Sequence, residues 1–456
     1  MSTYSVIQKS QLEGAKRLDA EYYQPEYLKI ANTLQSVPHE TLEAAAESLV
    51  SFGAYSLTSF IEWQESGIPF ITAENIRDGF IDYDSARFID EKVDEILKKS
   101  RVREDQVLLA MSGSVGNAAV AIDIPPKLNS NQDIVKITPR KGLSPYVLAA
   151  FLNSRYGKMQ ILRLPVGSVQ QHIFLWQMQT MLIPLFDRKV ATTIEESYKK
   201  GLEILKQSRS LHTQAERLLL KELGLEDFEE EMGLWSVVKL SDVQTAGRID
   251  AEYFQPKYKQ LESRIRIYGA RPLVEVIESV AAKFNPSKES TKQFKYVELS
   301  DINASIGVID GFSEVSGREA PSRARRVLKA NDVIVSSVEG SLGKVAIVGK
   351  AQADHLASTG FFQFRSKEIL PEVLLVLAKS IVLRYPLEQR CAGTILTAVP
   401  KESIKDILMP ILPEKTQQKI AELVRESHEA RAKAKQLLED AKRKVEELIE
   451  SGSSKH

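Results

Sequence analysis

The chain has 456 residues, of which 43% are hydrophobic and 27% are charged, and its 61 basic side chains equal its 61 acidic ones in number. This composition is typical of a globular protein long enough for two domains, each with its own core. A run of about 18 apolar residues is absent, so a membrane-spanning helix is not expected, and the first residues lack an apolar signal core, which favours a cytoplasmic protein.

A segment near the start of the chain recurs in its middle. Residues 17–27 read RLDAEYYQPEY and residues 248–258 read RIDAEYFQPKY, which is a shift of 231 residues (248 − 17). The same order continues with small gaps, because DQVLLAMSGSVG at 105–116 parallels DVIVSSVEGSLG at 332–343. Repetition over about half the chain indicates that a domain-sized unit was duplicated.

Each copy opens with this repeated segment, in which Asp19 or Asp250 is well placed to cap a helix. Apolar runs bounded by turn residues then predict strands at residues 68–73, 79–83, 106–111 and 118–122, and in the second copy at 295–299, 307–311, 332–337 and 344–348. A helix that begins at a proline follows in each copy, at about 145–162 and 371–390. Each copy is therefore expected to be an α+β head with a curved, mostly antiparallel sheet and a helix against it.

Each head is followed by a long segment in which apolar or small residues recur at spacings of three and four. The positions are Ile194, Ser197/Tyr198, Gly201, Leu205, Ser208, Leu211, Ala215 and Leu218, and then Ile420, Leu423, Ser427, Ala430, Ala434, Leu437, Ala441, Val445 and Leu448. This pattern, sustained over about five heptads, predicts a coiled coil of two helices about 54 Å long.

The predicted fold class is therefore α+β, with two similar heads joined by two long helices that form an antiparallel coiled coil with pseudo-twofold symmetry. The domains expected are a first head at 1–185, a central helix at 186–224, a second head at 232–411 and a C-terminal helix at 412–452.

Sequence motifs for catalysis and for nucleotide or metal binding are not evident. Gly340-Ser-Leu-Gly343 lacks the spacing of a P-loop, and Gly113-Ser-Val-Gly116 leads into a strand, so no helix N-terminus is available there for a phosphate. Hairpin turns explain both segments better. The six histidines are scattered, and the single cysteine, Cys391, excludes an intramolecular disulfide and a cysteine-based zinc site. A Ser-His-Asp set, a nuclease cluster and a methyltransferase signature are not found. We therefore expect a non-catalytic binding protein that holds no metal or cofactor of its own.

Basic turns at matching places in the two copies are candidates for DNA binding. Lys98, Arg101 and Arg103 precede the strand that begins at Asp105. The second copy has Arg323 and Arg325 before its equivalent strand. Basic side chains at strand ends can neutralise phosphates, although an ordinary solvated turn explains each run equally well.

Other polar loops differ between the copies. Residues 51–59 and 282–292 occupy comparable positions but share little sequence, which is typical of one scaffold that reads two targets. Polar side chains of this kind discriminate base edges in the major groove. The candidates are Asn117, Asn129, Asn131, Gln132, Gln170 and Gln171 in the first copy, and Asn285, Lys288, Lys292, Glu339, Ser341 and Lys344 in the second.

The order of these features resembles the specificity (S) subunit of type I restriction–modification systems. The resemblance covers nearly the full chain. It depends on the duplicated head, the two Gly-Ser-x-Gly turns, the segments Ile183-Pro-Leu and Met409-Pro-Ile, and the sequence Pro413-Glu-Lys-Thr-Gln417 at the start of the last helix. The first copy departs from the pattern, because its segment Leu185-Phe-Asp-Arg has no equivalent glutamine.

The resemblance implies that each head is a target recognition domain for one half of a bipartite, asymmetric DNA site, and that the paired helices set the gap between the halves. The chain would have no catalysis of its own. Its partners would be double-stranded DNA, two adenine methyltransferase (M) subunits that use S-adenosylmethionine, and, in a complete restriction complex, endonuclease (R) subunits that use ATP and Mg. Two alternatives stay open: a related system whose partner fuses methyltransferase and nuclease, and a coiled-coil scaffold whose heads bind protein.

Overall fold

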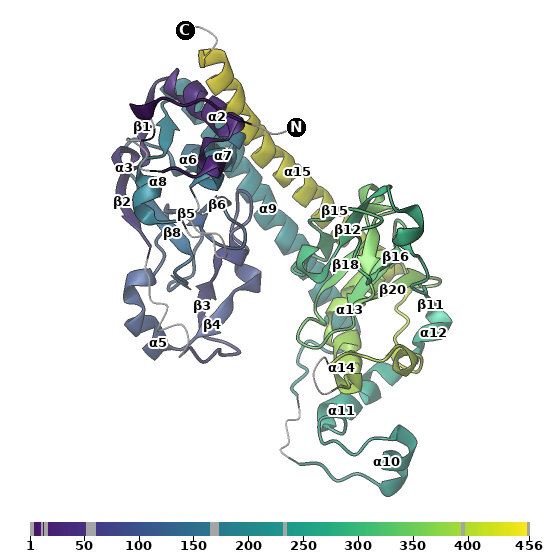
Figure 1. Ribbon diagram of the computed structural model, residues 1–456. Coiled ribbons are helices and arrows are strands. Elements are labelled where there is room, and N and C mark those ends of the chain that lie inside the picture. The colour runs from purple at the N-terminus through teal and green to yellow at the C-terminus, as the bar shows by residue number, and fades with distance from the viewer. Residues whose placement is uncertain are drawn as a thin grey trace. The chain divides into compact units, whose positions relative to one another are not determined.

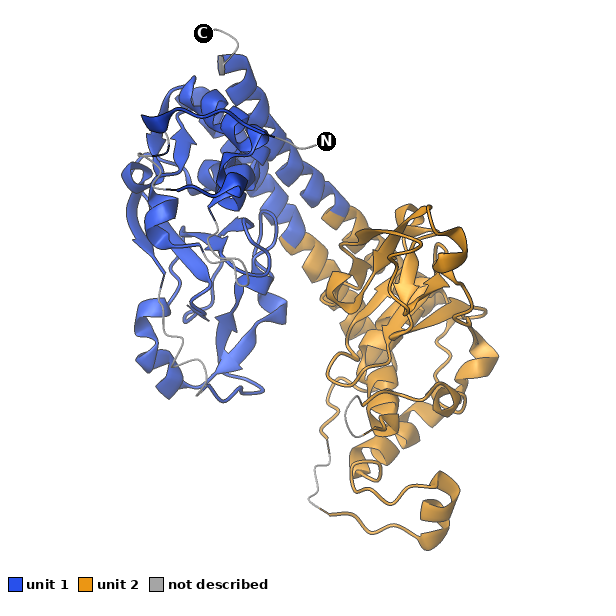
Figure 2. Cartoon of the chain, viewed as in Figure 1, with its two compact units in different colours: residues 1–205, 432–456 blue, residues 206–431 orange. Residues whose placement is uncertain are grey.

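The computed structural model describes residues 4–10, 12, 17–51, 61–164, 173–230, 235–393 and 397–453 (Figure 1). It divides into two compact units, which are residues 1–205 with 432–456 and residues 206–431 (Figure 2). Two long helices, α9 (Arg188–Glu222) and α15 (Glu414–Ser453), cross this division. Each unit therefore contains one head and one part of each long helix.

Unit 1 contains three sheets and a set of short helices. The largest sheet has the order β2-β8-β5-β6, a second has the order β4-β3-β7, and β1 pairs with β9. All pairs are antiparallel except β3 with β7. The strands are β1 (His39–Thr41), β2 (Ala46–Val50), β3 (Ile68–Ile71), β4 (Arg87–Ile89), β5 (Val107–Ala110), β6 (Ala118–Val120), β7 (Asn129–Ser130), β8 (Ile134–Pro139) and β9 (Leu182–Pro184). The α-helices are α2 (Pro25–Gln35), α3 (Leu42–Ala45), α5 (Glu91–Ile96), α6 (Pro145–Asn153), α7 (Arg155–Arg163) and α8 (Leu175–Gln179).

Unit 2 also contains three sheets, with the orders β11-β20-β17-β18-β14-β13, β15-β12-β19-β16 and β10-β21. The strands are β10 (Arg271–Pro272), β11 (Ile277–Ser279), β12 (Gln293–Val297), β13 (Ile302–Asn303), β14 (Val308–Ile309), β15 (Ser313–Ser316), β16 (Ala324–Val327), β17 (Val333–Ser336), β18 (Val345–Ile347), β19 (Leu356–Ser358), β20 (Phe361–Ser366) and β21 (Leu408–Met409). The α-helices are α10 (Leu240–Ala246), α11 (Pro256–Arg266), α12 (Leu273–Val276), α13 (Pro371–Lys379) and α14 (Ile381–Arg390).

The two heads share one topology. The order β2-β8-β5-β6 in unit 1 corresponds to β11-β20-β17-β18 in unit 2, and β4-β3-β7 corresponds to β15-β12-β19. Even the parallel pair recurs, as β3 with β7 and as β12 with β19. The predicted duplication and the α+β class are confirmed. The prediction of one curved sheet in each head was wrong in detail, because the strands divide among three sheets.

The helix predicted in each copy is in fact two helices. α6 and α7 are separated by Ser154, and α13 and α14 are separated by Ser380, both in extended backbone conformation. Each serine side chain then caps the second helix, since it accepts a hydrogen bond from the backbone of Gly157 (3.3 Å) or Val382 (3.2 Å). Serine competes with the helix for backbone hydrogen bonds, and this is the physical reason for the break.

The repeated opening segment fastens each head through an arginine. Arg17 pairs with Asp19 at 2.5 Å and donates to the carbonyl of Leu164 at 2.8 Å. In the second copy Arg248 pairs with Asp250 at 2.5 Å, and it donates to the carbonyl of Cys391 at 3.0 Å. Asp19 is the N-cap residue of the 3-10 helix Ala20–Tyr23, as predicted, but its side chain makes no capping hydrogen bond. Hydrogen bonds from the arginines lower the pKa of both aspartates.

The long helices pack against each other within each unit. In unit 1, Ser197 donates to the carbonyl of Leu437 (3.3 Å), and a Cβ on Gly201 would lie 3.3 Å from the carbonyl oxygen of Ala434. The residue number of the contact rises along α9, from 197 to 201, while it falls along α15, from 437 to 434, so the two helices are antiparallel. In unit 2, Ser208 donates to the carbonyl of Ser427 at 2.7 Å.

On both long helices, α9 and α15, some of the buried positions lie one residue after the positions predicted to form the coiled-coil contact. Leu211, Leu218, Leu423, Leu437 and Leu448 are only partly buried, whereas the following residues His212, Leu219, Val424, Leu438 and Ile449 are buried. The helices pack against their heads as well as each other, so the buried positions follow the 3.6-residue period of an ordinary helix. None of the helices in the described part of the chain combines the length and the apolar character needed to cross a bilayer.

Candidate nucleic-acid interface

In unit 2, a short 3-10 helix, η5 (Pro286–Glu289), and the turn that follows it each present one lysine to solvent. Asn285 caps this helix, since its Oδ1 accepts from the backbone of Ser287 at 3.3 Å. Lys288 and Lys292 are exposed. Lys292 pairs with Glu289 at 2.7 Å and lies 5.1 Å from the centre of the Phe294 ring.

The start of β16 places two arginines beside this loop. Arg323 and Arg325 are exposed, while Ala324 and Arg326 between and after them are buried, as strand alternation requires. The backbone amide of Phe284 donates to the carbonyl of Arg325 at 3.1 Å, which joins the loop to the strand. We refer to Lys288, Lys292, Arg323 and Arg325 as the basic face of unit 2. Such a face is suited to phosphate neutralisation.

Arg326 has a different role from its neighbours. Its side chain is buried and donates to the carbonyl of Val280 at 2.7 Å, so it holds the base of the loop in place. Burial lowers the pKa of its guanidinium.

The turn between β17 and β18 uses its polar side chains internally. The hydroxyl of Ser341 lies 2.9 Å from that of Ser336 and donates to the carbonyl of Val338 at 3.0 Å. Lys344 donates to the carbonyl of Ile302 at 3.2 Å, and Glu339 is exposed. The predicted hairpin turn is confirmed, since β17 and β18 are antiparallel and Gly340 has φ 73°.

In unit 1 the corresponding basic turn is largely neutralised. Arg101 pairs with Asp94 at 2.6 Å and with Glu95 at 2.9 Å, and Lys98 pairs with Glu95 at 3.2 Å. Asp94 is fully buried. Burial opposes its ionisation, but hydrogen bonds from Arg101 and Asn129 outweigh that effect and lower its pKa. Arg101 therefore stabilises the turn, whereas Arg103 is exposed.

The candidate amides of unit 1 lie mostly inside the head. Asn129 is fully buried, so it cannot reach a base edge without unfolding of the turn. Asn117 is partly buried and donates to the carbonyl of Ile76 at 3.2 Å. Asn131 donates to Asp133 at 3.0 Å. Gln132 is partly buried, and its Oε1 has no hydrogen-bond partner among the described residues. Gln170 and Gln171 lie outside the described residues, as do residues 52–60.

Within unit 2 the structure thus joins the loop that carries η5 to β16, and in both units it uses several of the other candidates in internal contacts. One basic residue that the motif reading missed is Lys295, which is exposed on β12 and lies 4.7 Å from the centre of the Phe312 ring. The alternation of β12, with Phe294 and Tyr296 buried on either side of Lys295, was the sequence signal that could have identified it. Among the described residues, no group of three or more metal-ligating side chains occurs.

Comparisons with known proteins give matches only among solved structures. No protein-family model matches the sequence, and no curated protein does. The chain is similar to the S subunit of a type I restriction–modification system from M. genitalium, with 14% identity and TM-score 0.38 over 91% of this chain and 94% of that one. It is also similar to the HsdS subunit from Thermoanaerobacter tengcongensis, with 14% identity and TM-score 0.28 over 92% and 96%.

A third similar structure is a chain of a type I R-M system studied for complex assembly and conformational transition, with 14% identity and TM-score 0.28 over 92% of this chain and 98% of that one. All three come from type I restriction–modification systems, the group that the sequence resembles.

Proposed function

We propose that this chain is a DNA specificity subunit of the type I restriction–modification kind. It reads a bipartite, asymmetric site through its two heads and directs adenine methylation, and restriction where a nuclease is present, by partner subunits. The observation that carries the proposal is that both heads have one strand order, while the loops at 51–59 and 282–292 differ in sequence. One framework with two sets of loops is suited to reading two different half-sites.

In this proposal residues 1–185 and 232–411 are target recognition domains, and the long helices set the gap between half-sites. α9 has 35 residues and α15 has 40, which correspond to about 52 and 60 Å at 1.5 Å per residue. One turn of DNA is about 34–36 Å, so lengths of this order suit half-sites roughly one to one and a half turns apart.

The partners proposed are two adenine methyltransferase subunits, which would supply S-adenosylmethionine, and endonuclease subunits, which would supply ATP and Mg. The chain itself contributes binding and geometry. A related system, in which one partner polypeptide carries both methyltransferase and nuclease, would use the same two heads in the same way.

A map of adenine methylation in the host, with and without this gene, tests the proposal. We expect deletion to remove one bipartite motif from the map. An unchanged map in a host that expresses the chain together with its methyltransferase would contradict the proposed function.

Exchange of one head tests the assignment of domains. Replacement of residues 1–185 by the head of a different specificity subunit should change one half-site and leave the other half-site and the gap unchanged. A change in both half-sites would contradict independent reading by the two heads. Removal of one turn from α9 should shorten the gap or abolish methylation, and an unchanged gap would contradict the role of the helices.

Salt dependence separates DNA recognition from the alternative of a protein-binding scaffold. Binding to DNA that neutralises several phosphates weakens steeply between 50 and 200 mM salt, by about a thousandfold or more for six contacts. A scaffold with no nucleic-acid surface would show no specific duplex binding at either salt concentration.

A further inference from the structure

In unit 2, strands β12 and β15 form a two-stranded ribbon at one edge of the smaller sheet. β15 is the edge strand in the order β15-β12-β19-β16. It pairs with β12 from Gln293 to Tyr296, whereas β19 pairs with β12 only at Tyr296 and Val297. The first part of β12 therefore has a single partner strand, which lies about 4.8 Å away. A ribbon of two strands fits the major groove of DNA, which is about 12 Å wide.

One face of this ribbon is polar and open to solvent. Strand alternation places Gln293 and Lys295 on the face opposite to the buried Phe294 and Tyr296. On β15, Glu314 lies directly opposite Lys295 in the register, so the two side chains point to the same face. Gln293, Lys295 and Glu314 are exposed. Their side chains make no hydrogen bond or ion pair with another residue in the described part of the chain. The face thus offers donors and acceptors that the fold leaves unused.

The same face carries an exposed aromatic ring. Phe312 directly precedes β15 and is 45% exposed. The Nζ of Lys295 lies 4.7 Å from the centre of this ring, and the ring of His355 meets it edge-on at 5.2 Å. His355 is itself buried, and burial lowers the pKa of its imidazole, so it is a neutral packing partner at pH 7. Phe312 is therefore held on two sides while part of its ring stays open. We refer to Gln293, Lys295, Phe312 and Glu314 as the ribbon face.

The loop that carries η5 packs against one end of the ribbon. The backbone amide of Gly317, which follows β15, donates to the carbonyl of Lys292 at 2.9 Å, and that of Arg318 donates to the carbonyl of Ser290 at 3.0 Å. Gly317 permits this approach, since a Cβ at its position would lie 2.3 Å from the carbonyl oxygen of Glu289. Lys292 and Arg318 are exposed, so cations suited to phosphates border the end of the ribbon.

The corresponding ribbon of unit 1 lacks these groups. Strand register aligns Phe70 of β3 with Tyr296 of β12, and the rest of both ribbons follows. The residues of unit 1 at the places of Gln293, Lys295, Phe312 and Glu314 are Gly67, Pro69, Ala86 and Phe88. None of these four side chains can form a hydrogen bond with a base edge. The two heads thus keep one strand order but differ at this face, as readers of two different half-sites would.

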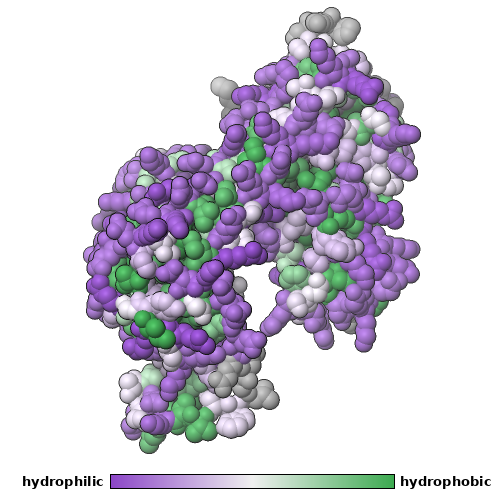
Figure 3. Space-filling view, turned by 180° about the vertical axis from the view of Figure 1, so that it is seen from behind, coloured by the Kyte–Doolittle hydropathy of each residue, from purple (hydrophilic) through white to green (hydrophobic). Residues whose placement is uncertain are grey.

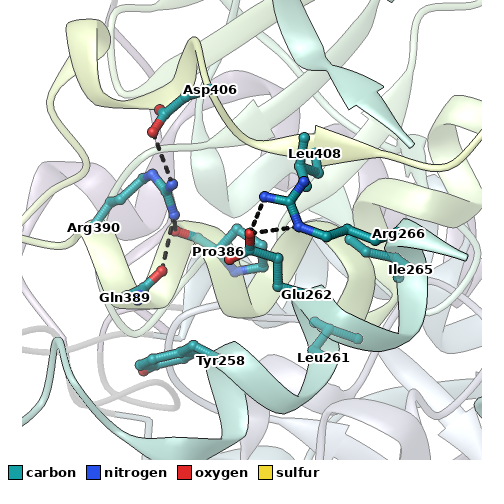
Figure 4. A pocket seen from close by; sticks show the side chains of 10 residues that line it. All are labelled: Tyr258, Leu261, Glu262, Ile265, Arg266, Pro386, Gln389, Arg390, Asp406 and Leu408. Carbon is teal, nitrogen blue, oxygen red and sulfur yellow. Dashed lines mark hydrogen bonds and ion pairs between the residues drawn. The ribbon is translucent and has the colours of Figure 1, made fainter. Parts of the chain in front are cut away.

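Two other surfaces of unit 2 have a different character. Apolar residues gather at the end of unit 2 that carries α10 (Figure 3), where Leu240 is exposed. A pocket of about 220 Å³ lies between α11, α14 and β21, and its cations are paired, Arg390 with Asp406 at 3.5 Å and Arg266 with Glu262 (Figure 4). Aliphatic side chains and paired charges offer little to a base edge, whereas the unpaired groups of the ribbon face are suited to it.

We propose that the ribbon face reads base edges in the major groove of the half-site that belongs to the second head. This inference rests on the proposed function and adds which strands and side chains make the contacts. Lys295 donates to the O6 and N7 acceptors of guanine, and Glu314 accepts from the N4 amino group of cytosine. Since directly opposed residues have Cβ atoms about 4.5–5.5 Å apart, these two side chains read one G·C pair. Gln293 forms two hydrogen bonds with adenine, and Phe312 contacts the methyl group of thymine.

The test uses the full-length chain with the methyltransferase encoded beside its gene, and duplexes that carry the mapped bipartite site. Each base pair of the second head's half-site is replaced in turn, and fluorescence anisotropy measures binding. Replacement of the G·C pair should weaken binding by the unchanged chain roughly tenfold to a hundredfold. Lys295→Ala and Glu314→Ala should lose this preference at that pair alone. Replacement of thymine by uracil, which removes only a methyl group, should weaken binding by the unchanged chain but not by Phe312→Ala.

Matched controls exist for the cation and for the ring. Lys350→Ala removes an exposed cation of unit 2 that lies outside the ribbon. Trp63→Ala removes a ring of unit 1 that is 43% exposed and has the guanidinium of Arg87 4.8 Å from its centre. Both variants should keep the preferences of the unchanged chain throughout the second head's half-site. Thermal unfolding of Lys295→Ala and Glu314→Ala should match that of Lys350→Ala, because all three side chains lie in solvent.

Several outcomes would overturn the inference. Ribbon variants that weaken binding to every duplex by the same factor would limit the ribbon face to phosphate contacts, and variants with unaltered preferences would place base reading elsewhere. A half-site without a G·C pair would contradict the roles of Lys295 and Glu314. In each of these cases the proposed function stands. An unchanged chain that binds the mapped site no better than an unrelated duplex would remove the proposed function together with this inference.

Discussion

The two heads contact the long helices at equivalent positions but with different chemistry. In unit 1 the helix positions are Gly201, Leu202 and Leu205, which pack with Ala434 and Leu438. The residues 226 positions later, which contact the second head, are Ser427, His428 and Arg431. The junction of unit 1 is therefore mainly apolar, although Lys442 of α15 pairs there with Asp78 at 3.0 Å, and the junction of unit 2 is a buried polar network.

The network of unit 2 involves three helices and a strand loop. Ser208 and Ser427 each donate to the other's backbone carbonyl at 2.7 Å. The Nζ of Lys379 lies 2.9 Å from Glu216 and donates to the carbonyl of Ser305 at 2.6 Å. It also lies 2.5 Å from Nε2 of His212, whose ring is parallel to that of His428 at 6.4 Å. Arg431, with 4% of its side chain exposed, pairs with Asp310.

The two junctions differ in what they contribute: one contributes mainly to stability and the other to the register of the helix pair. Apolar contacts like those of unit 1 constrain the helices by shape alone, and apolar side chains of similar volume can replace one another there. A buried charge tolerates no shift, because a displaced partner leaves it unpaired. We infer that the polar junction fixes the register of the helix pair, and that the apolar junction supplies stabilisation.

The largest effect is expected from breaking the pair of Arg431 and Asp310. Asp310→Ala leaves a charged arginine buried without its carboxylate, which should cost about 3–5 kcal/mol of unfolding free energy. Urea unfolding at pH 7 measures this loss. The matched control is Asp440→Ala, which breaks a 2.8 Å pair with Arg443 on the exposed side of α15 and should cost under about 1 kcal/mol. Equal losses in the two variants would show that the polar junction has no special cost.

A smaller loss of stability is expected from mild acid, through His428 of unit 2. Burial lowers the pKa of His428 from 6.5 to about 4, and the nearby Lys379 and Arg431 act in the same direction. Because the folded chain binds this proton less readily than the unfolded chain, stability is full above pH 6.5 and falls as the pH drops towards 4. The loss between pH 7 and pH 5 should be about 2 kcal/mol.

The variant His428→Leu, which copies Leu202 of the other junction, should remove that part of the pH dependence. Unfolding free energies at pH 7 and pH 5 for both proteins measure the difference. A variant with the same loss as the unchanged chain would assign the acid sensitivity to other groups.

A still smaller effect is expected in unit 1. Tyr198 is fully buried and its hydroxyl donates to the carbonyl of Gly79 at 2.7 Å, which is one polar contact of this mainly apolar junction. Tyr198→Phe should cost about 1 kcal/mol, because the carbonyl loses its donor. Tyr146→Phe, in a ring 5.8 Å away that is only partly buried, serves as the control and should stay within about 0.5 kcal/mol. A loss of 3 kcal/mol or more in Tyr198→Phe would make the two junctions equally dependent on polar contacts.

The sequence alone predicted the duplicated heads and the two long helices, because repeats and heptad spacing are local patterns. It did not predict the polar junction. His212 and Arg431 fall one residue away from the expected seam, and their partners Lys379 and Asp310 lie far along the chain. Spacing identifies one side of a helix but does not identify which distant side chain completes a pair.

The same limit applies to the candidate interface. The basic runs could be recognised as exposed turns, but only the fold identifies Asp94 as the buried partner of Arg101. Ser341 was a candidate by its residue type, and its hydroxyl is used within the turn. In contrast, Arg323 and Arg325 stay exposed as the pattern predicts. Whether either arginine contacts DNA stays a prediction.

The smallest effect on stability, under about 0.5 kcal/mol, is expected from Arg323→Ala combined with Arg325→Ala, because both side chains lie in solvent. Their effect should fall on DNA binding. If each arginine neutralises one phosphate, the slope of log K against log salt should become shallower by about 1.8, since one phosphate contributes about 0.9. Fluorescence anisotropy with a duplex that carries the recognised site, over a series of salt concentrations, measures this slope.

The control for charge is Arg443→Ala with Lys444→Ala, which removes two exposed cations from α15. A general effect of net charge on steering would act through the whole protein, so both double variants would then change the slope equally. A larger change for the β16 pair would assign the phosphate contacts to the basic face of unit 2. That result would distinguish the exposed arginines of the second head from the paired Arg101 of the first.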